Sequence, residues 1–456
     1  MKILSPLTLC LTTVLCSGCT NVLKSDYRSP EVSYPINWSK GDLDVNTAPF
    51  DWKEFNDPHL DNWLHKVMTS NNNIAIAALR VYRARLDAER VGITNTPALK
   101  GSLGVDGKTQ LNNSSGWTKS GSSSLSTSYE LDLWGKIAHQ RDIAEWAIHA
   151  SEEDFRAMRL TLLSEAGNNY WRIGFVNQQI AILRQSIDYA KETLHLAEVR
   201  YRAGNTSSLD VIDAQQNLLT QENQLTGLQR ERSQLLNQQA VLLGTVPGGQ
   251  IVEPTTLPKG SLPQVNANIP ASILMRRPDI SAKEWQLREA LATVDIKRSE
   301  YYPTFNLTGA FGTSSTSLLA LLHNPVGSVG ANLTLPFLEW RQRDIEVKIA
   351  RNDYEQRVLE FKQLLYKAMS GIEDVLSFRN QLLVQETRLR KELELARKSE
   401  KLNEVRYRHG AVHISFWLDA QEKRRQAELR LDENRFNQLQ NLTKIYLEFG
   451  GASTFP

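Results

Sequence analysis

The sequence predicts a mostly α-helical chain with a small β part, organised as two copies of one structural unit. The first observation is a motif at residues 198–215 that recurs at residues 404–421 with the same residue types at one fixed offset. The second is a pair of long segments, 136–202 and 341–408, that contain no proline. The third is an alternation of apolar and polar residues ahead of each segment. Because self-similar halves indicate a repeated architecture, we interpret the chain as an internal duplication.

The repeated motif predicts the tip of a helical hairpin. Each copy reads Arg-Tyr-Arg-x-Gly, is followed by Asp-Ala-Gln, and lies between two long segments without proline. Gly204 and Gly410 are each expected to end a helix, because a helix C-terminus favours a left-handed residue there. Ser207 and Asp210 resemble a cap that starts the next helix. The matched positions are Arg200/Arg406, Tyr201/Tyr407, Arg202/Arg408, Gly204/Gly410, Asp213/Asp419, Ala214/Ala420 and Gln215/Gln421.

The composition is that of a chain long enough for two or more domains. It has 456 residues, a formal net charge of +2 and 41% hydrophobic residues. The balanced charge gives no reason to expect nucleic acid as a partner. Beyond the N-terminus no run of about 18 apolar residues occurs, so no transmembrane helix is expected.

The N-terminus is typical of a bacterial lipoprotein. Residues 1–18 have the basic start and short apolar core of a secretory signal peptide. They lead into Leu-Cys-Ser-Gly-Cys, which resembles a lipobox, although Cys16 stands where the motif usually has leucine. We therefore expect Cys19 to carry a covalent lipid such as palmitate, with no other cofactor. Ordinary signal-peptide cleavage nearby is the alternative. Thr20 after the cysteine favours the outer membrane, by the same resemblance to lipoproteins.

The rest of the chain is expected to pass through the same elements twice. Each half begins with a short helix, continues through two strands and a long helix to the tip, and returns by a shorter helix. The Pro-rich segment between the halves is expected to be a linker outside the core. The expected boundaries begin with an extended lipid-anchored arm at 19–55 and a first repeat at 56–244, which has a β-hairpin at 98–134 and a tip near 204. A linker is expected at 245–270. A second repeat at 271–450, with a β-hairpin at 304–338 and a tip near 410, and a tail at 451–456 complete the chain.

The strand segments carry apolar residues at odd positions and polar residues at even positions. In the first strand, for example, Leu103 and Val105 alternate with Ser102 and Asp106. Strands of about 10 residues with one apolar face are what a membrane β-barrel needs, and a soluble sheet with one wet face has the same pattern. Four strands cannot close a barrel, because about eight is the smallest number that does. Since open edges are not tolerated in lipid, membrane-spanning strands would require at least two chains to share one barrel.

The lipoprotein N-terminus, the two β-hairpins, the two very long helices and the paired tips together resemble the TolC-type outer-membrane factors. The chain is most similar to the lipoprotein branch that works with resistance-nodulation-division pumps, and the resemblance covers essentially residues 19–450. It implies a homotrimer in which three chains with four strands each form one β-barrel in the outer membrane of a Gram-negative bacterium. The helices would continue as a hollow α-barrel through the periplasm.

The same resemblance assigns roles to the tips. They would form the periplasmic end of the channel, where helical hairpins of an adaptor (membrane fusion) protein dock. The alternative is that the glycines only permit tight turns and the arginines are solvated. The residues expected on the adaptor-facing surface are Arg200, Tyr201, Arg202, Gly204, Arg406, Tyr407, Arg408 and Gly410.

Two acidic residues are candidates for the closed aperture. The family places an acidic ring at the position of Asp419, and Asp213 is its counterpart in the first repeat. Carboxylates around a symmetry axis would repel one another and favour cations, so their protonation could couple to opening. The alternative is that each acid stabilises the positive end of its own helix dipole.

The sequence does not indicate a metal site or an enzyme. His409 and His413 flank Gly410, but two histidines in an exposed turn without a third ligand make a poor metal site. No His-Glu-x-x-His or Gly-x-Ser-x-Gly motif is present, and Gly107-Lys108-Thr109 lacks the first glycine of a phosphate-binding loop.

The resemblance to TolC-type factors therefore implies an outer-membrane exit channel that passively conducts small toxic compounds or drugs. An adaptor and an inner-membrane pump, of the resistance-nodulation-division type, would deliver the substrate. Two alternatives stay open: an exit duct for type I protein secretion, and a structural coiled-coil lipoprotein of the envelope. The paired amphipathic hairpins favour a channel, because a scaffold has no need of them.

Overall fold

Two compact units divide the chain, and each takes residues from both sequence repeats. The computed structural model describes residues 23–32, 52–109, 116–249, 252–263, 271–316 and 325–451, so the signal peptide, Cys19 and parts of the arm and linker lie outside it. Unit 1 comprises the segment up to Val32, Ala78–Asp154 and Asp279–Leu364, and unit 2 comprises Ser33–Ala77, Phe155–Pro278 and Leu365–Pro456.

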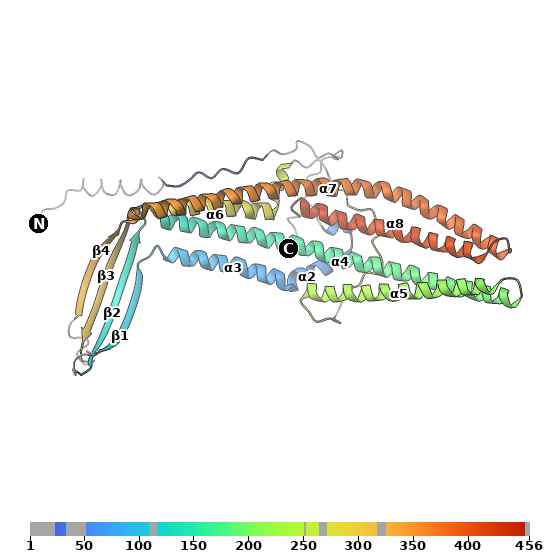
Figure 1. Cartoon of the computed structure of the whole chain (residues 1–456), viewed down its shortest axis with the longest axis horizontal. Coiled ribbons are helices and arrows are strands. Elements are labelled where there is room, and N and C mark those ends of the chain that lie inside the picture. Colours follow the sequence, from blue (N-terminus) through green and yellow to red (C-terminus); the bar gives the residue numbers. More distant parts are fainter. Residues whose placement is uncertain are drawn as a thin grey trace. The chain divides into compact units, whose positions relative to one another are not determined.

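Unit 1 contains a four-stranded antiparallel sheet with the strand order β1-β2-β3-β4 (Figure 1). The strands are β1 (Ala98–Lys108), β2 (Thr118–Leu131), β3 (Thr304–Ser315) and β4 (Pro325–Thr334). The central pair joins the two repeats, because β2 comes from the first and β3 from the second. Strands β1 and β4 each pair on one side within the described chain, so both edges of the sheet are open there.

The register places odd-numbered strand residues on one face and even-numbered residues on the other. Leu125 lies opposite Gly101 on β1 and Phe311 on β3, and Phe311 lies opposite Gly327 on β4. The alternation predicted along each strand therefore becomes one continuous apolar face across the sheet. The exposed apolar side chains on this face are Leu99, Leu103, Val105, Leu125, Leu307, Phe311, Val329 and Leu333.

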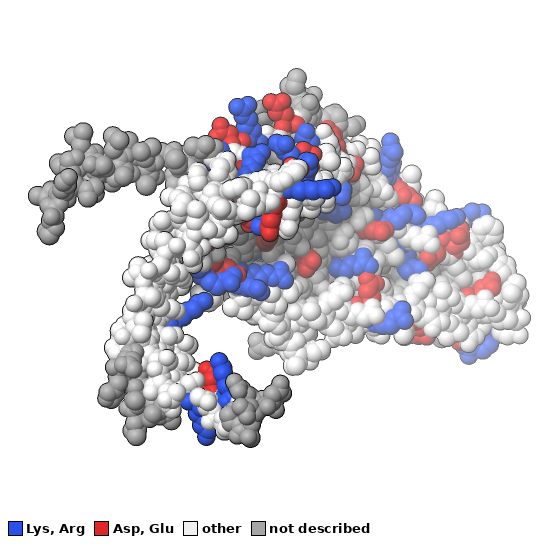
Figure 2. Space-filling view, turned by 60° about the vertical axis from the view of Figure 1, so that its left-hand side comes forward, with Lys and Arg blue, Asp and Glu red and all other residues white. Residues whose placement is uncertain are grey.

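The sheet also carries few charged side chains. Strands β3 and β4 contain none, and those of β1 and β2 are Lys100, Asp106, Lys108, Lys119 and Glu130. Figure 2 shows charges of both signs intermingled over the helices, whereas the visible surface of the sheet is nearly free of them except towards one end. Of these five residues only Lys119, near the start of β2, has an odd number and lies on the apolar face. A face with so few charges is what a lipid-facing sheet requires.

The passage from strand to helix is fixed by polar contacts in unit 1. The indole Nε1 of Trp134 donates to the carbonyl of Pro303 at 2.8 Å, which ties the end of β2 to the start of β3. The carboxylate of Asp132 accepts from the N–H groups of Ile137 and Ala138 at 3.1 and 2.8 Å. These N–H groups lie in the first turn of the next helix, where they have no partner within the helix and where an acid complements the dipole.

The helices differ greatly in length. The longest are α4 (Lys136–Arg202) with 67 residues and α7 (Trp340–Arg408) with 69, each on the order of 100 Å at about 1.5 Å per residue. They return through α5 (Ser208–Leu243) and α8 (Ile414–Glu448). The shorter elements are η1 (Trp52–Phe55), α2 (Pro58–Ser70), α3 (Asn72–Ile93), η2 (Ala271–Arg276), α6 (Pro278–Ser299) and η4 (Pro336–Glu339).

Membrane-spanning helices are not part of the described structure. Within the described ranges, no helix is both long enough and apolar enough to cross a membrane.

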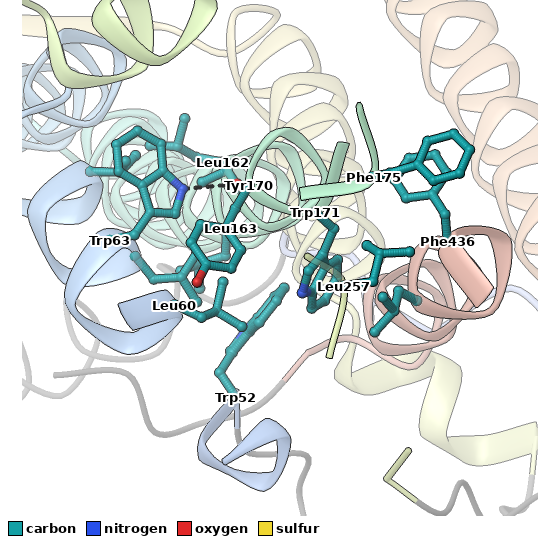
Figure 3. Close-up of a cluster of buried hydrophobic side chains, with 14 residues drawn as sticks. Trp52, Leu60, Trp63, Leu162, Leu163, Tyr170, Trp171, Phe175, Leu257 and Phe436 are labelled. Atoms are coloured by element: carbon teal, nitrogen blue, oxygen red, sulfur yellow. Dashed lines mark hydrogen bonds between the residues drawn. The ribbon is translucent and has the colours of Figure 1, made fainter. Parts of the chain in front are cut away.

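The main core of unit 2 is aromatic (Figure 3). The indole of Trp63 donates to the carbonyl of Ala166 at 2.9 Å, so its polar atom is satisfied although the side chain is fully buried. Trp171 stacks on Trp52, and the helix approaches Trp52 at Gly167, where a Cβ would lie 2.8 Å from the indole ring. The core members are Trp52, Leu60, Trp63, Leu64, Val67, Leu162, Leu163, Ala166, Tyr170, Trp171, Phe175, Leu257, Phe436 and Leu439.

The segment between the repeats contributes to this core, contrary to the expectation of a linker outside it. Leu257 is buried among the aromatic residues because the segment is bound closely to the helices. The carboxylate of Glu253 accepts from Arg232 of α5 and Asn177 of α4. The guanidinium of Arg435 on α8 donates to the carbonyl of Pro258 at 3.0 and 3.1 Å. The linker therefore ties helices of both repeats together.

Candidate functional site at the paired helical tips

The two tips end in the same backbone geometry. Gly204 follows α4, Gly410 follows α7, and both have a φ of +73°. In each tip the glycine N–H donates to the carbonyl three residues back, and the next N–H donates to the carbonyl five residues back, at 2.8–2.9 Å. This Schellman arrangement satisfies carbonyls of the last turn and needs a left-handed residue at the glycine position. The prediction that these glycines end the long helices is confirmed.

The start of the first return helix differs from the prediction. Ser207 occupies the N-cap position of α5, but its side chain makes no capping hydrogen bond. Instead, the hydroxyl of Thr206 donates to the carboxylate of Asp210. The predicted cap formed by Ser207 and Asp210 is therefore wrong, because Oδ2 of Asp210 accepts from Thr206 while Oδ1 faces His413 of the other tip.

A small apolar cluster joins the two tips. The ring of Tyr407 stacks on Trp417 with centroids 5.7 Å apart, and Ile414 is buried beside them. Ala197 and Ala214, from the two helices of the first hairpin, complete the buried set. Burial raises the pKa of the Tyr407 hydroxyl above its ordinary value, so this phenol stays neutral.

Arg200 connects the first tip to the second. Its Nη1 donates to the carbonyl of Tyr407 at 2.6 Å. Its guanidinium carbon lies 4.6 Å from the centre of the Tyr407 ring. One side chain thus makes a charge-assisted hydrogen bond and a cation–π contact across the tips.

A second connection joins Asp210 of the first tip to His413 of the second. Nε2 of His413 lies 2.9 Å from Oδ1 of Asp210, a distance that makes an ion pair when the imidazole is protonated. Oδ1 accepts no hydrogen bond within the described chain, so the imidazole approaches it outside hydrogen-bond geometry. Asp210 is only 1% exposed, and a carboxylate buried this deeply depends on its neighbours for stabilisation.

The two tyrosines of the repeated motif have different environments. Tyr201 is 49% exposed, whereas Tyr407 is 1% exposed. The expectation that Tyr407 lies on the adaptor-facing surface is therefore wrong for this chain, because its ring fills the cluster between the tips. Arg200 is likewise turned towards the second tip, whereas its counterpart Arg406 is exposed.

The remaining predicted docking residues lie at the surface of the tips. Arg202 and Arg408 are exposed, and Arg408 pairs with Glu404 one turn earlier at 2.7 Å. Two large apolar side chains that the motif did not indicate, Leu209 and Phe416, are also more than half exposed there. Each lies in the first turn of its return helix. No sequence motif marks these two residues, and only their exposure in the structure identifies them as surface residues of the tips.

The candidate aperture residues differ in exposure. Asp419 is exposed on α8 and pairs with Lys423 one turn later at 2.6 Å. Asp213 on α5 is partly buried. The two carboxylates make no contact with each other among the contacts of the described residues, and their roles at the aperture stay predictions. Among the described residues, no group of three or more His, Cys, Asp and Glu side chains could hold a metal ion.

Comparison with known proteins identifies the architecture to which these tips belong. The sequence profile of the family described as outer membrane efflux protein matches residues 63–245 and 269–451, one segment in each half. The chain belongs to this outer membrane efflux protein family.

Relatives of this efflux protein align over nearly their whole length. It is 28% identical over 455 residues to the toxin and drug export protein A of Aggregatibacter actinomycetemcomitans, covering 98% of this chain and 97% of that protein. It is 29% identical over 475 residues to the pyoverdine export outer membrane protein OpmQ of Pseudomonas aeruginosa, covering 99% and 97%. A further relative, the probable outer membrane lipoprotein SilC of Salmonella typhimurium, is 23% identical over 458 residues, covering 97% of each chain.

The fold is also that of a solved channel. The efflux protein superposes on the outer-membrane channel OprN with a TM-score of 0.83 at 23% identity, covering 94% of this chain and 98% of that one. The predicted fold class, mostly α with a small β part, and the resemblance to TolC-type factors are both confirmed.

Proposed function

We propose that this efflux protein is the outer-membrane exit channel of a tripartite efflux system. It would conduct small toxic compounds or drugs passively from a pump and an adaptor to the exterior. Family membership supports export across the outer membrane, and the relatives' names include drug, toxin and pyoverdine export. A pump of the resistance-nodulation-division type and a periplasmic adaptor are the proposed partners.

The observation that carries this proposal is the sheet. Its odd face is apolar, its edges β1 and β4 are open, and four strands are too few to close a barrel. Pairing β4 of one chain with β1 of the next would remove every edge, as lipid requires. Three chains then supply three times four strands to one barrel, and the even, polar face lines its interior. The sheet requires at least two chains, and the resemblance to TolC-type factors makes the proposed assembly a homotrimer.

The tips supply the second part of the proposal. The exposed residues Tyr201, Arg202, Arg406 and Arg408, with the glycine turns, form the surface on which adaptor hairpins would dock. The connections from Arg200 to Tyr407 and from Asp210 to His413 hold the two hairpins of a chain together. We propose that this arrangement is the closed state and that opening parts the hairpins.

Membrane anchoring is the third part. Cys19, at the end of the lipobox-like sequence, is the proposed site of acylation. The lipid would hold the N-terminal arm at the outer membrane of a Gram-negative cell. The lipoprotein name of the relative SilC supports this assignment.

Native mass spectrometry of the detergent-extracted protein, combined with export in a host that lacks its own channel, tests the function. We expect a trimer whose subunits have lost residues 1–18 and gained acyl mass, and we expect it to restore drug tolerance with a matching adaptor and pump. A monomer would overturn the shared barrel and favour an envelope scaffold. A trimer that exports a protein toxin but restores no drug tolerance would favour a type I secretion duct.

A substitution in the first turn tests the docking surface. Gly204→Val places a β-branched residue at a φ of +73°, a conformation that such residues rarely adopt. Beyond the neighbouring residues, the added Cβ would have no described atom within 4 Å, so backbone strain and not crowding at the Cβ is the expected effect. We expect trimer assembly to persist while export and adaptor pull-down are lost. Unchanged export would remove the assignment of docking to this turn.

A further inference from the structure

We propose that Asp295 on α6 binds Ser25 and thereby fixes the N-terminal arm to unit 1. The contacts that Lys24, Ser25 and Tyr27 make with the helices are called the clamp below. Through the arm, the clamp would also fix the lipid proposed on Cys19. The binding of the arm rests on contacts of the described residues alone, and only its effect on the lipid rests on the proposed function. The arm segment 23–32 runs along the helices of unit 1 (Figure 1).

Two successive arm residues contact the helices through polar groups. Lys24 pairs with Asp142 of α4 at 2.8 Å. Ser25 donates twice to Asp295, from its backbone N–H at 2.8 Å and from its hydroxyl at 2.6 Å. The arm therefore contacts a helix from each sequence repeat within two successive residues.

The next aromatic residue adds a stacked contact. The ring of Tyr27 lies 4.6 Å from the guanidinium carbon of Arg288, and the ring of Trp285 lies 4.8 Å from the same atom. His149 of α4 stacks on Trp285 at 4.7 Å. Arg288 thus contacts Tyr27 of the arm and Trp285 of its own helix. The stack of Trp285 on His149 then connects α6 to α4.

Asp295 is a buried acid whose short hydrogen bonds come from the arm. Its carboxylate is 2% exposed, and burying a charge is costly unless hydrogen bonds replace its water. Arg298 offers one contact to Oδ1, at 3.4 Å, and also donates to the Ser25 hydroxyl at 3.0 Å. The two short hydrogen bonds come from Ser25. Without the arm, the carboxylate would keep only the long contact to Arg298 among those described.

The clamp limits where a lipid on Cys19 can lie. Cys19 precedes Ser25 by six residues, and an extended chain spans at most about 3.3–3.6 Å per residue, so the tether reaches roughly 20 Å. Asp295 lies near the end of α6, which stops at Ser299, and β3 begins at Thr304. An acyl chain on Cys19 would therefore be tethered within that distance of the end of α6.

Trypsin release of the lipopeptide from the full, membrane-extracted protein tests the clamp. Cleavage after Lys24 or the exposed Arg28 frees a peptide that carries Cys19. We expect Ser25→Ala and Asp295→Ala each to speed this release at least tenfold. Thr293→Ala is the matched control, because Thr293 is exposed on α6 and bonds only within its own helix among the described contacts, so its release rate should stay within twofold of wild type.

Release of the Ser25→Ala lipopeptide at the wild-type rate would overturn the clamp. Ser25 lies on the arm, so this variant decides the question even if Asp295→Ala does not assemble. The mass of the released peptide tests the anchor separately. A peptide without acyl mass would remove Cys19 lipidation from the proposed function, while the comparison of release rates would still decide the clamp.

Discussion

Replacing Arg200 with alanine should shift the tips towards the open state. The substitution removes the charged hydrogen bond to the Tyr407 carbonyl and the cation–π contact with its ring. A hydrogen bond to a charged group contributes about 1.5–3 kcal/mol, and an exposed cation–π contact contributes about 0.5–1 kcal/mol. Together they stabilise the joined hairpins by about 2–4 kcal/mol in each chain. Since about 1.4 kcal/mol is a tenfold change, the closed state should lose on the order of 10²-fold in its equilibrium constant per chain.

Conductance of the purified protein in planar bilayers measures this shift. We expect Arg200→Ala to raise the mean conductance and the open fraction well above wild type, and to admit large antibiotics into cells that lack the pump. Arg406→Ala is the matched control, since it removes the same residue from the same motif position in the other repeat. Arg406 is exposed and makes no described contact across the tips, so its conductance should stay near wild type.

Two outcomes would refute this reasoning. An assembled Arg200→Ala trimer with wild-type conductance would show that the contact with Tyr407 does not hold the tip closed. An equal rise for Arg200→Ala and Arg406→Ala would attribute the effect to lost positive charge at the tip, and not to the bond that only Arg200 makes. Circular dichroism and native mass spectrometry of each variant confirm that the comparison is made on folded trimers.

Three further predictions concern the core, the linker and the sheet. Gly167→Val should lower the thermal unfolding temperature, because the added Cβ lies 2.8 Å from the ring of Trp52 and overpacking costs about 1–3 kcal/mol; Gly227→Ala, in open space, should not lower it. Arg232 holds the pKa of Glu253 below its usual value. The pair therefore stabilises the fold at pH values above the pKa that Glu253 has in the unfolded chain, and this contribution is lost as the pH falls through its lower pKa in the folded protein. Acid unfolding of Glu253→Gln should accordingly show a weaker pH dependence between those two values, and an unchanged profile would contradict the linkage. Val329→Arg on the apolar face should reduce membrane assembly, at about 2–4 kcal/mol for a lipid-facing arginine, whereas Ser328→Arg on the polar face should assemble normally.

Local sequence patterns were sufficient to predict the main elements. The long helices follow from segments without proline, and the strands follow from a period of two that the register aligns across all four strands. The turns follow from Gly204 and Gly410, because few other residues adopt a φ of +73°. Each of these predictions depends on neighbours within a few residues, which is the range over which a sequence pattern carries information.

Contacts between distant segments were not predictable in the same way. Tyr201 and Tyr407 have the same local sequence, Arg-Tyr-Arg, yet one is exposed and the other buried. Leu257 lies in a Pro-rich segment with no periodic pattern, and it is buried because Arg232 and Arg435 bind the segment that contains it. Such outcomes are decided by packing partners far away in the chain, which a period or a motif does not specify.

The duplication explains which tip residues shape the hairpins and which ones connect them. The positions shared by both repeats, above all the two glycines, give the same turn in each tip. The contact between Asp210 and His413 uses positions at which the repeats differ, since Asp210 has Phe416 as its counterpart and His413 has Ser207. Asp210 is buried and Phe416 is more than half exposed, so the same register position faces the other tip in one repeat and solvent in the other. The shared residues thus provide two equal hairpins, and the differing residues give each hairpin a distinct place in the joined tip.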